Sequence, residues 1–207
     1  MKPRLGILIL IALSLASLAV AQVTPKTGTS QFQVTSTTFM NNQTLPLSAI
    51  NNIVMNGINV CSLDGSTGGN QSPELSWTNV PQGTKSFVVV LFDTTASFTH
   101  WGMYNVSASA TGLPENAGVP GSPFGTQVIN DFFIGAEYDG PCPPPNVEPT
   151  VHHYVFTVYA LNKELQLKSS ANFPANAETL YNALIDSGAA GHILASAKIT
   201  GLYSTTP

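Results

Sequence analysis

The sequence predicts a mainly β domain, an antiparallel Greek-key-type β-sandwich with one or two short C-terminal helices. Short apolar runs alternate along the chain with clusters of Gly, Pro, Asn and Ser, which is typical of many strands joined by turns. Two of these runs, 86–93 and 152–161, are strongly strand-like. Apolar residues at helical spacing appear near the end of the chain, from residue 174 onward.

The first strand candidates come early in the chain. The segment 32–39, FQVTSTTF, alternates as a strand does. The segment 51–60, NNIVMNGINV, has short apolar groups broken by Asn and Gly, which indicates a strand, a turn and a second strand. A loop is expected over 61–73, which is rich in Gly, Ser and Asn, and the next strand is expected over 74–81.

The middle of the chain contains the most apolar strand candidate. The run 86–93, SFVVVLFD, has the pattern of a central strand that is buried on both faces, and it ends on Asp93. The segment 100–106, HWGMYNV, is expected to be the neighbouring strand. The loop 107–127 is rich in Gly, Pro and Ser, and loops of that length are usually functional or mobile.

A proline-rich loop, 128–150, leads into the clearest strand pattern, HHYVFTVYAL at 152–161. A period of two places His152 and Tyr154 on one face of this strand, and His153 on the other face. We therefore expect His152 and Tyr154 to be neighbours in space.

The C-terminal region has helical spacing. The segment 174–186, PANAETLYNALID, predicts a helix that Gly188 ends. The segment 191–198, GHILASAK, is interpreted as a second short helix with His192 packed on its apolar face, and 199–204 as a last strand. No internal repeat and no heptad pattern is found.

The composition excludes one class of partner. Only 9% of the residues are charged, and the net charge is −4. Beyond the first residues, MKPR, there is no basic cluster that could contact a phosphate backbone. The sequence therefore predicts that the protein does not bind nucleic acid.

The N-terminus has the organisation of a signal peptide over 1–21. A basic start is followed by an apolar run and by an A-x-A cleavage signal at 19–21. We expect export to the periplasm or the exterior, cleavage before Gln22, a loose leader over 22–31 and one domain over 32–207, with no stable membrane anchor after cleavage. An uncleaved anchor is the alternative, because the apolar run has nearly the length of a membrane span.

The chain has two cysteines, Cys61 and Cys142, both in the part expected to be exported. An oxidising compartment would allow them to form a disulfide. They do not form a C-x-x-C redox motif, and two thiols alone cannot close a structural zinc site.

Ionisable and polar residues gather at the ends of the predicted strands, beside the rigid loop YDGPCPPP at 138–145. They are Asp93, His100, His152 and Tyr154. We expect the Asp93 carboxylate to accept a hydrogen bond from His100 and to raise the pKa of that imidazole, so that the site offers donors to a phosphate or carboxylate. The alternative is that these are ordinary core-edge residues. Two histidines and one aspartate could also bind a metal, but the pattern is unspecific, and no metal or cofactor is predicted.

Several motifs resemble, in order, those of the phosphatidylethanolamine-binding proteins, most closely the bacterial Raf-kinase-inhibitor-like branch. The resemblance covers about 32–204. Its motifs are SPELSW (72–77), TKSFVVVLFD (84–93), HWGMYNV (100–106), LPEN (113–116), ND (130–131), YDGPCPPP (138–145), HHYVFTVYAL (152–161) and HILASAKITGLYS (192–204).

The resemblance implies a β-sandwich with a C-terminal helical element and a small pocket for phosphate-type anions or phosphorylated head groups. Its rigid wall would be the segment 140–144, with a cis X-Pro bond among its prolines. By position, the resemblance assigns these pocket residues: Asp93, His100, Gly140, Cys142, Pro143, His152 and Tyr154.

Two departures from the family pattern bear on the ligand. The usual D-P-D-A-P motif reads DTTAS over 93–97, so that Thr95 replaces the second aspartate. The insertion NVEPTV at 146–151 lengthens the approach to the pocket. We expect phosphate binding to survive these changes better than recognition of an ethanolamine.

The leading functional hypothesis is an exported, non-enzymatic binding or regulatory protein that takes a small anionic or phosphorylated ligand and modulates a protein partner. A hydrolase or isomerase with Asp93 and His100 as an acid/base pair is an alternative, although the chain has no nucleophile motif. A further alternative is an inhibitor of an extracellular enzyme that acts through the loop 107–127.

Overall fold

The chain forms eleven strands and a single α-helix in the residues that the structure, a computed structural model, describes: 30–170 and 172–206. The predicted signal peptide, 1–21, and the leader residues 22–29 lie outside the described residues. In chain order the elements are β1 (Gln33–Thr35), β2 (Gln43–Thr44), the 3-10 helix Leu47–Ala49, β3 (Val54–Met55), β4 (Ile58–Asn59), β5 (Leu75–Thr78), β6 (Ser86–Asp93), β7 (Phe98–Ser107), β8 (Gly112–Leu113), β9 (Thr126–Gln127), β10 (His152–Leu161), α1 (Ala177–Ala189) and β11 (Ile193–Tyr203).

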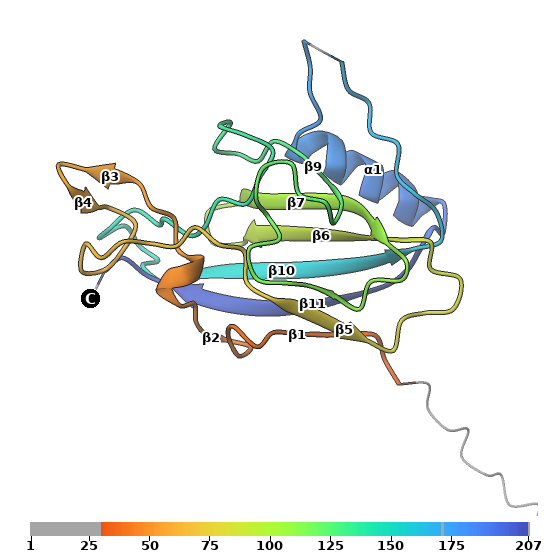
Figure 1. Cartoon of the computed structure of the whole chain (residues 1–207), viewed down its shortest axis with the longest axis horizontal. Coiled ribbons are helices and arrows are strands. Elements are labelled where there is room, and N and C mark those ends of the chain that lie inside the picture. The colour runs from red at the N-terminus through yellow and green to blue at the C-terminus, as the bar shows by residue number, and fades with distance from the viewer. Residues whose placement is uncertain (1–29, 171, 207) are drawn as a thin grey trace, which may run out of the picture. The chain divides into compact units, whose positions relative to one another are not determined.

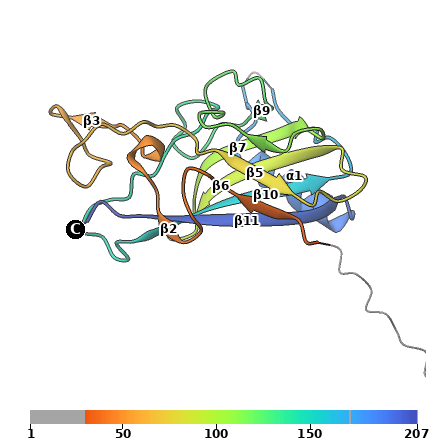
Figure 2. The ribbon, with the colours of Figure 1, turned by 60° about the horizontal axis from the view of Figure 1, so that its bottom comes forward.

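A six-stranded sheet, in the order β2-β11-β10-β6-β7-β9, is the centre of the domain (Figure 1). Its long strands β7, β6, β10 and β11 are paired antiparallel. A three-stranded sheet, β1-β5-β8, and the β3-β4 hairpin complete the β structure (Figure 2). The mainly β prediction is therefore confirmed, whereas the Greek-key order of the sandwich stays a prediction.

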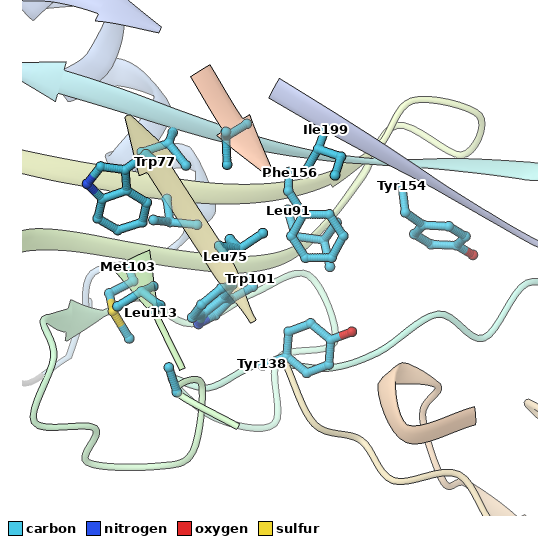
Figure 3. Close-up of a cluster of buried hydrophobic side chains, with 14 of the residues drawn as sticks. Leu75, Trp77, Leu91, Trp101, Met103, Leu113, Tyr138, Tyr154, Phe156 and Ile199 are labelled. Atoms are coloured by element: carbon cyan, nitrogen blue, oxygen red, sulfur yellow. The ribbon is translucent and has the colours of Figure 1, made fainter. Parts of the chain in front are cut away.

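The two faces of the central sheet are both covered. Side chains of β6 alternate between two hydrophobic clusters, so that every residue of the strand except Phe92 is buried, as predicted for a central strand. One cluster lies between the central sheet and β1, β5 and β8 (Figure 3). The other contains Leu180 and Leu184 of α1 and covers the opposite face. The ends of the central strands are thereby held in a fixed register.

The helix α1 confirms the helix predicted over 174–186. Asn176 caps it, since its side chain accepts a hydrogen bond from the Thr179 amide while the Thr179 hydroxyl accepts one from the Asn176 amide. The helix continues past Gly188 to Ala189, and the chain turns at Gly191, which has a φ of 70°. No helix in the described residues is long and apolar enough to cross a membrane.

The second helix predicted over 191–198 is wrong. The residues from Ile193 onward belong to β11, which pairs with β10 along its length. The local spacing of apolar residues predicted a helix. The backbone groups of this segment instead form hydrogen bonds to β10, which lies far away in the sequence. His192 consequently lies in the turn before β11, where its Nδ1 is 2.9 Å from Asn162 Oδ1, and not on a helix face.

One predicted loop contains short strands. The predicted loop 107–127 includes β8 and ends in β9, and Ala110 in it accepts a hydrogen bond from Trp77 Nε1. The strand, turn and strand predicted over 51–60 are confirmed as β3 and β4.

Candidate functional site

A cavity of about 190 Å³ lies where β6 ends and β10 begins. The sheet register places Asp93, the last residue of β6, opposite Tyr154. The cavity is lined by Asp93, Ala96, Phe98, His100, Phe132, Cys142, Pro143, Pro144, His152 and Tyr154. A larger hollow of about 640 Å³ beside β1 and β11 has a single ionisable lining residue, Lys198. The smaller cavity is therefore the better candidate for a site.

The buried acid–imidazole pair of the cavity is Asp93 with His152. Asp93 Oδ2 is 2.6 Å from His152 Nδ1, and Asp93 Oδ1 accepts hydrogen bonds from the amides of Thr95 and Ala96 at 2.8 and 3.1 Å. Because an ionised carboxylate can only accept a hydrogen bond, Nδ1 of His152 carries the proton. Nε2 of His152 then remains available to a ligand in the cavity. The predicted pairing of Asp93 with His100 is wrong. The register between β6 and β10 places His152, and not His100, beside the Asp93 carboxylate.

His100 is held by a backbone group. Its Nδ1 is 2.8 Å from the carbonyl oxygen of Asp139, which can only accept, so Nδ1 is the protonated nitrogen. Burial lowers the pKa of His100, and the attraction of Asp139 and Asp93 does not outweigh burial. The expectation that the pKa of this imidazole is raised is therefore wrong, although the two carboxylates do act in that direction.

A buried polar network behind His100 was missed from the sequence. Asp139 Oδ2 accepts a hydrogen bond of 2.8 Å from Asn130 Nδ2, which also donates to the carbonyl oxygens of His100 and Glu137. Asn70 Oδ1 accepts a hydrogen bond of 2.7 Å from the Gly140 amide. Asn130 and Asp139 do lie in two of the quoted motifs, ND and YDGPCPPP, which was the available signal. This network ties the loop wall to β7.

Gly140 supports the wall but does not line the cavity. A Cβ at this position would lie 2.2 Å from the Ala49 carbonyl oxygen and 2.7 Å from the Asn51 nitrogen, so only glycine fits this close approach. Cys142 and Pro143 do line the cavity. The cis X-Pro bond predicted for the wall is wrong, since the cis peptide bond of the described residues joins Glu148 to Pro149.

The predicted disulfide between Cys61 and Cys142 is confirmed, with an S–S distance of 2.05 Å. Cys61 lies two residues after the end of β4 and is fully buried. The bond therefore connects the hairpin to a residue of the cavity wall.

The phenol of Tyr154 has no partner although it is buried. No hydrogen bond reaches Tyr154 Oη within the described residues, and burial together with the Asp93 carboxylate raises the pKa of Tyr154, so it stays a neutral donor. The rings of Phe98 and Phe132 pack against His100 with centroid distances of 5.0 and 5.4 Å. Phe132 was also missed, because an aromatic residue in a loop gives no signal by itself.

His153 and Thr95 do not line the cavity. His153 lies on the opposite face of β10 from His152 and Tyr154, as the period of two predicted. It is exposed, and its amide donates a hydrogen bond of 3.0 Å to Thr95 Oγ1. Among the described residues there is also no cluster of three His, Cys, Asp or Glu side chains that could hold a metal ion.

Comparison with known proteins places this geometry in a family. The family model described as phosphatidylethanolamine-binding protein matches residues 35–204. The chain belongs to the phosphatidylethanolamine-binding protein family. Its cavity is thus formed within the matched part of the chain.

The relatives include bacterial and archaeal members of this family. The chain is 34% identical to the UPF0098 protein YbcL of Escherichia coli over 91% of this chain and 96% of the relative. It is 39% identical to a UPF0098 protein of Methanothermobacter thermautotrophicus over 66% of this chain and 84% of the relative.

Solved structures agree with this assignment. The crystal structure of E. coli YbcL, described as a new member of the mammalian PEBP family, matches with a TM-score of 0.67 and 33% identity over 84% of this chain and 99% of that chain. A putative phosphatidylethanolamine-binding protein homologue from Chlamydia trachomatis matches with a TM-score of 0.61 and 27% identity over 84% of this chain and 97% of that chain. The bacterial branch predicted from the motifs fits these relatives.

Proposed function

We propose that this member of the phosphatidylethanolamine-binding protein family binds a small anion, phosphate or a phosphorylated head group, in the cavity between β6, β7 and β10. One observation carries the proposal: the His100 and His152 rings and the unpartnered Tyr154 hydroxyl line the same cavity, and each imidazole already uses its Nδ1 elsewhere. Once both imidazoles are protonated, their Nε2–H groups and the Tyr154 hydroxyl offer three hydrogen-bond donors to one oxyanion.

The hydrogen bonds of Asp93 favour an anion over an ammonium group. Both carboxylate oxygens are occupied, by His152 and by the amides of Thr95 and Ala96. A cationic ligand would have to compete with these donors for the carboxylate. An anion needs no such exchange, because it binds to groups that have no other partner.

Binding of the anion should be accompanied by uptake of a proton. Burial lowers the pKa of His100, and an anion beside the ring would favour the charged imidazolium. The affinity is therefore expected to increase as the pH falls.

The test is calorimetric titration with inorganic phosphate and with phosphoethanolamine. We expect His152→Ala to weaken binding at least about tenfold, as the loss of a charged hydrogen bond implies. The matched control is His153→Ala, the neighbouring exposed histidine on the other face of β10, which should bind as the wild type does. Absence of binding by the wild type, or equal loss in both variants, would contradict the proposal.

We further propose that the protein functions after export. The Cys61–Cys142 disulfide supports this, because such bonds persist in oxidising compartments. Mass spectrometry of material isolated from the periplasm or the medium should give an N-terminus at Gln22 and no free thiol; intact material that remains in the cytoplasm would contradict export.

Acid–base catalysis is a second candidate function, favoured by the hydrogen bond that orients His152 on Asp93. Phosphomonoester or ester turnover that disappears in His152→Ala and persists in His153→Ala would support it. Binding of phosphate without any turnover would contradict catalysis and support the non-enzymatic binding function.

A further inference from the structure

The hollow of about 640 Å³ lies where β1 of the three-stranded sheet comes beside β11 of the central sheet (Figures 1 and 2). It is lined by the segment 31–35, which contains β1, by 196–198 of β11 and by Thr157 of β10. Its volume is within the range of about 300–1,000 Å³ that is usual for ligand sites. None of these residues lines the anion cavity, so the hollow is a separate surface.

The edge of β11 that faces away from β10 is only partly paired. Thr200 directs its backbone groups to this edge, since its carbonyl accepts a hydrogen bond of 2.7 Å from the Asn42 amide and its amide donates one of 2.9 Å to Asn41 Oδ1. Successive residues of an antiparallel strand direct these groups to alternate sides, so Ser196 and Lys198 face the same way as Thr200. Within the described residues, no hydrogen bond reaches the backbone of Ser196 or Lys198 at this edge.

The strand β1 also has a free edge. Val34 lies opposite Trp77 of β5, and the Trp77 amide donates its hydrogen bond to the Thr111 carbonyl on the other side of β5. Val34 and Trp77 are therefore a pair without mutual hydrogen bonds, and the Val34 amide and carbonyl point away from β5. In the part of the chain that the structure describes, these two groups have no partner. Val34 lines the hollow, which is thus bordered by unpaired backbone groups of two strands.

The side chains around the hollow form an apolar side and a polar side. Phe32 and Val34 are buried in the hydrophobic cluster, and Ala197 packs against that cluster. Ser196 and Lys198 occupy alternate positions of β11 and are exposed. An extended chain along β11 would therefore meet apolar groups with every second side chain and polar groups with the others.

Lys198 provides the charge of this surface. No other charged residue lines the hollow, and Lys198 forms no salt bridge with a described residue. Pairing of Lys198 with Ser196 or Lys198 of a second copy of the chain would place the two ammonium groups diagonally or directly opposite each other, where like charges repel. Lysine at a sheet edge also discourages unselective strand pairing. An acidic segment of a different chain matches this edge best.

We propose that the hollow beside β1 and β11 is a protein-interaction site, in which an extended acidic segment of a partner chain adds to the free edge of β11 as a further strand. The segment continues the line of β2, which occupies the same edge at residues 201 and 202. Its backbone exchanges hydrogen bonds with Ser196 and Lys198, its inner side chains face Val34 and Ala197, and an acidic side chain lies beside the Lys198 ammonium. This site does not depend on the anion cavity.

The test is fluorescence polarisation of the purified protein with a labelled, end-blocked peptide of the sequence VTVEVTV, which alternates as the hollow requires and carries one glutamate. The control peptide VTVKVTV differs only in the central charge and should bind about threefold more weakly or less. Nuclear magnetic resonance should show slower hydrogen exchange of the Ser196 and Lys198 amides when VTVEVTV is added. The Thr200 amide already has a partner and should exchange slowly with and without peptide.

Two variants test the two parts of the contact. Ser196→Pro removes an edge N–H, and its ring obstructs the approach of a strand, so binding of VTVEVTV should fall at least about tenfold. The domain should still fold, because this N–H has no partner in the described residues, and urea unfolding checks this. Lys198→Glu should reverse the preference between the two peptides. The matched control Lys85→Glu makes the same charge change at an exposed position outside the hollow and should bind as the wild type does.

Failure of the wild type to bind VTVEVTV, or unchanged binding by a folded Ser196→Pro variant, would overturn the proposal. Binding that leaves the exchange of the Ser196 and Lys198 amides unchanged would place the peptide elsewhere and would also overturn it. A dimer in analytical ultracentrifugation that Ser196→Pro abolishes would assign the edge to a second copy of the chain, against the proposal. The affinity for inorganic phosphate should be the same in these variants as in the wild type, so the anion-binding function stands or falls separately.

Discussion

The two histidines of the cavity are held by two different parts of the molecule. His152 begins β10 and is oriented by Asp93 at the end of β6, so both members of this pair belong to the central sheet. His100 of β7 is oriented by the Asp139 carbonyl, which belongs to the loop that forms the wall. The position of His152 therefore depends on strand register, and that of His100 depends on loop packing.

The two aspartates also differ in the group that each offers to its histidine. Asp93 contacts His152 directly, whereas the Asp139 side chain is turned toward Asn130 and reaches His100 only through its backbone. Loss of the Asp93 carboxylate removes the partner of an imidazole. Loss of the Asp139 carboxylate weakens the loop but leaves the carbonyl in place.

The largest effect is expected from Asp93→Ala. It leaves buried donors of His152, Thr95 and Ala96 without an acceptor, and it should lower the free energy of unfolding by about 3 kcal/mol and weaken phosphate binding about tenfold. Asp139→Ala should cost about 1–2 kcal/mol, because Asn130 keeps two other acceptors. Urea unfolding and phosphate calorimetry measure both quantities.

Equal loss of affinity in Asp93→Ala and Asp139→Ala would contradict the division into a sheet-held and a loop-held histidine. A larger loss of unfolding free energy in Asp139→Ala than in Asp93→Ala would also contradict it.

A smaller effect concerns the pH dependence of stability. Burial lowers the pKa of His100 in the folded chain, whereas an unfolded imidazole titrates near pH 6.5. The unfolded chain therefore binds more protons as the pH falls below about 6.5, and the folded chain loses stability, by up to about 1 kcal/mol between pH 7 and 5.5. Urea unfolding of His100→Gln should lack this contribution; an unchanged pH dependence in that variant would assign it to other groups.

The affinity for an anion should change with pH in the opposite direction. Sulfate is a suitable probe because it does not titrate in this range. Its affinity should increase from pH 7 to 5.5 in the wild type and increase less in His100→Gln, since the bound anion favours the protonated imidazole. A sulfate affinity that falls with the pH would contradict proton uptake on binding.

The smallest effect is expected from Tyr154→Phe. The hydroxyl is buried without a partner, so its removal should leave stability unchanged or raise it by up to about 1 kcal/mol. Phosphate affinity should nevertheless fall about fivefold, the value of one hydrogen bond. A variant that is less stable would mean that the hydroxyl has a partner in the folded protein, and an unchanged affinity would remove Tyr154 from the binding site.

Part of the site could be predicted because its residues lie where strands end. The apolar run before Asp93 and the period of two from His152 to Tyr154 are local patterns, and the sheet register confirms that they place these three side chains together. The cysteine count was likewise enough to predict one disulfide. Local patterns succeed where a strand presents alternate residues to a core.

The hydrogen-bond partners of these side chains could not be predicted from local patterns. The acceptor for His100 is a carbonyl in a loop 39 residues away, and the partner of Asp93 is 59 residues away. The segment 193–198 has helical spacing by itself, yet it is a strand because β10 offers it a complete ladder. These outcomes depend on contacts between distant segments, which local propensity does not contain.

Three properties of this protein follow from the order of its residues: it is mainly β, its polar residues gather at strand ends beside a proline-rich loop, and its two cysteines can pair. They can be predicted because periodicity and composition are properties of short segments. Tertiary structure alone decided which imidazole the Asp93 carboxylate contacts, that burial lowers the pKa of His100, and that backbone groups of β1 and β11 stay unpaired beside a hollow. Hydrogen-bond partners, burial and exposure arise only when distant segments pack together, and the chemistry of the cavity follows from that packing.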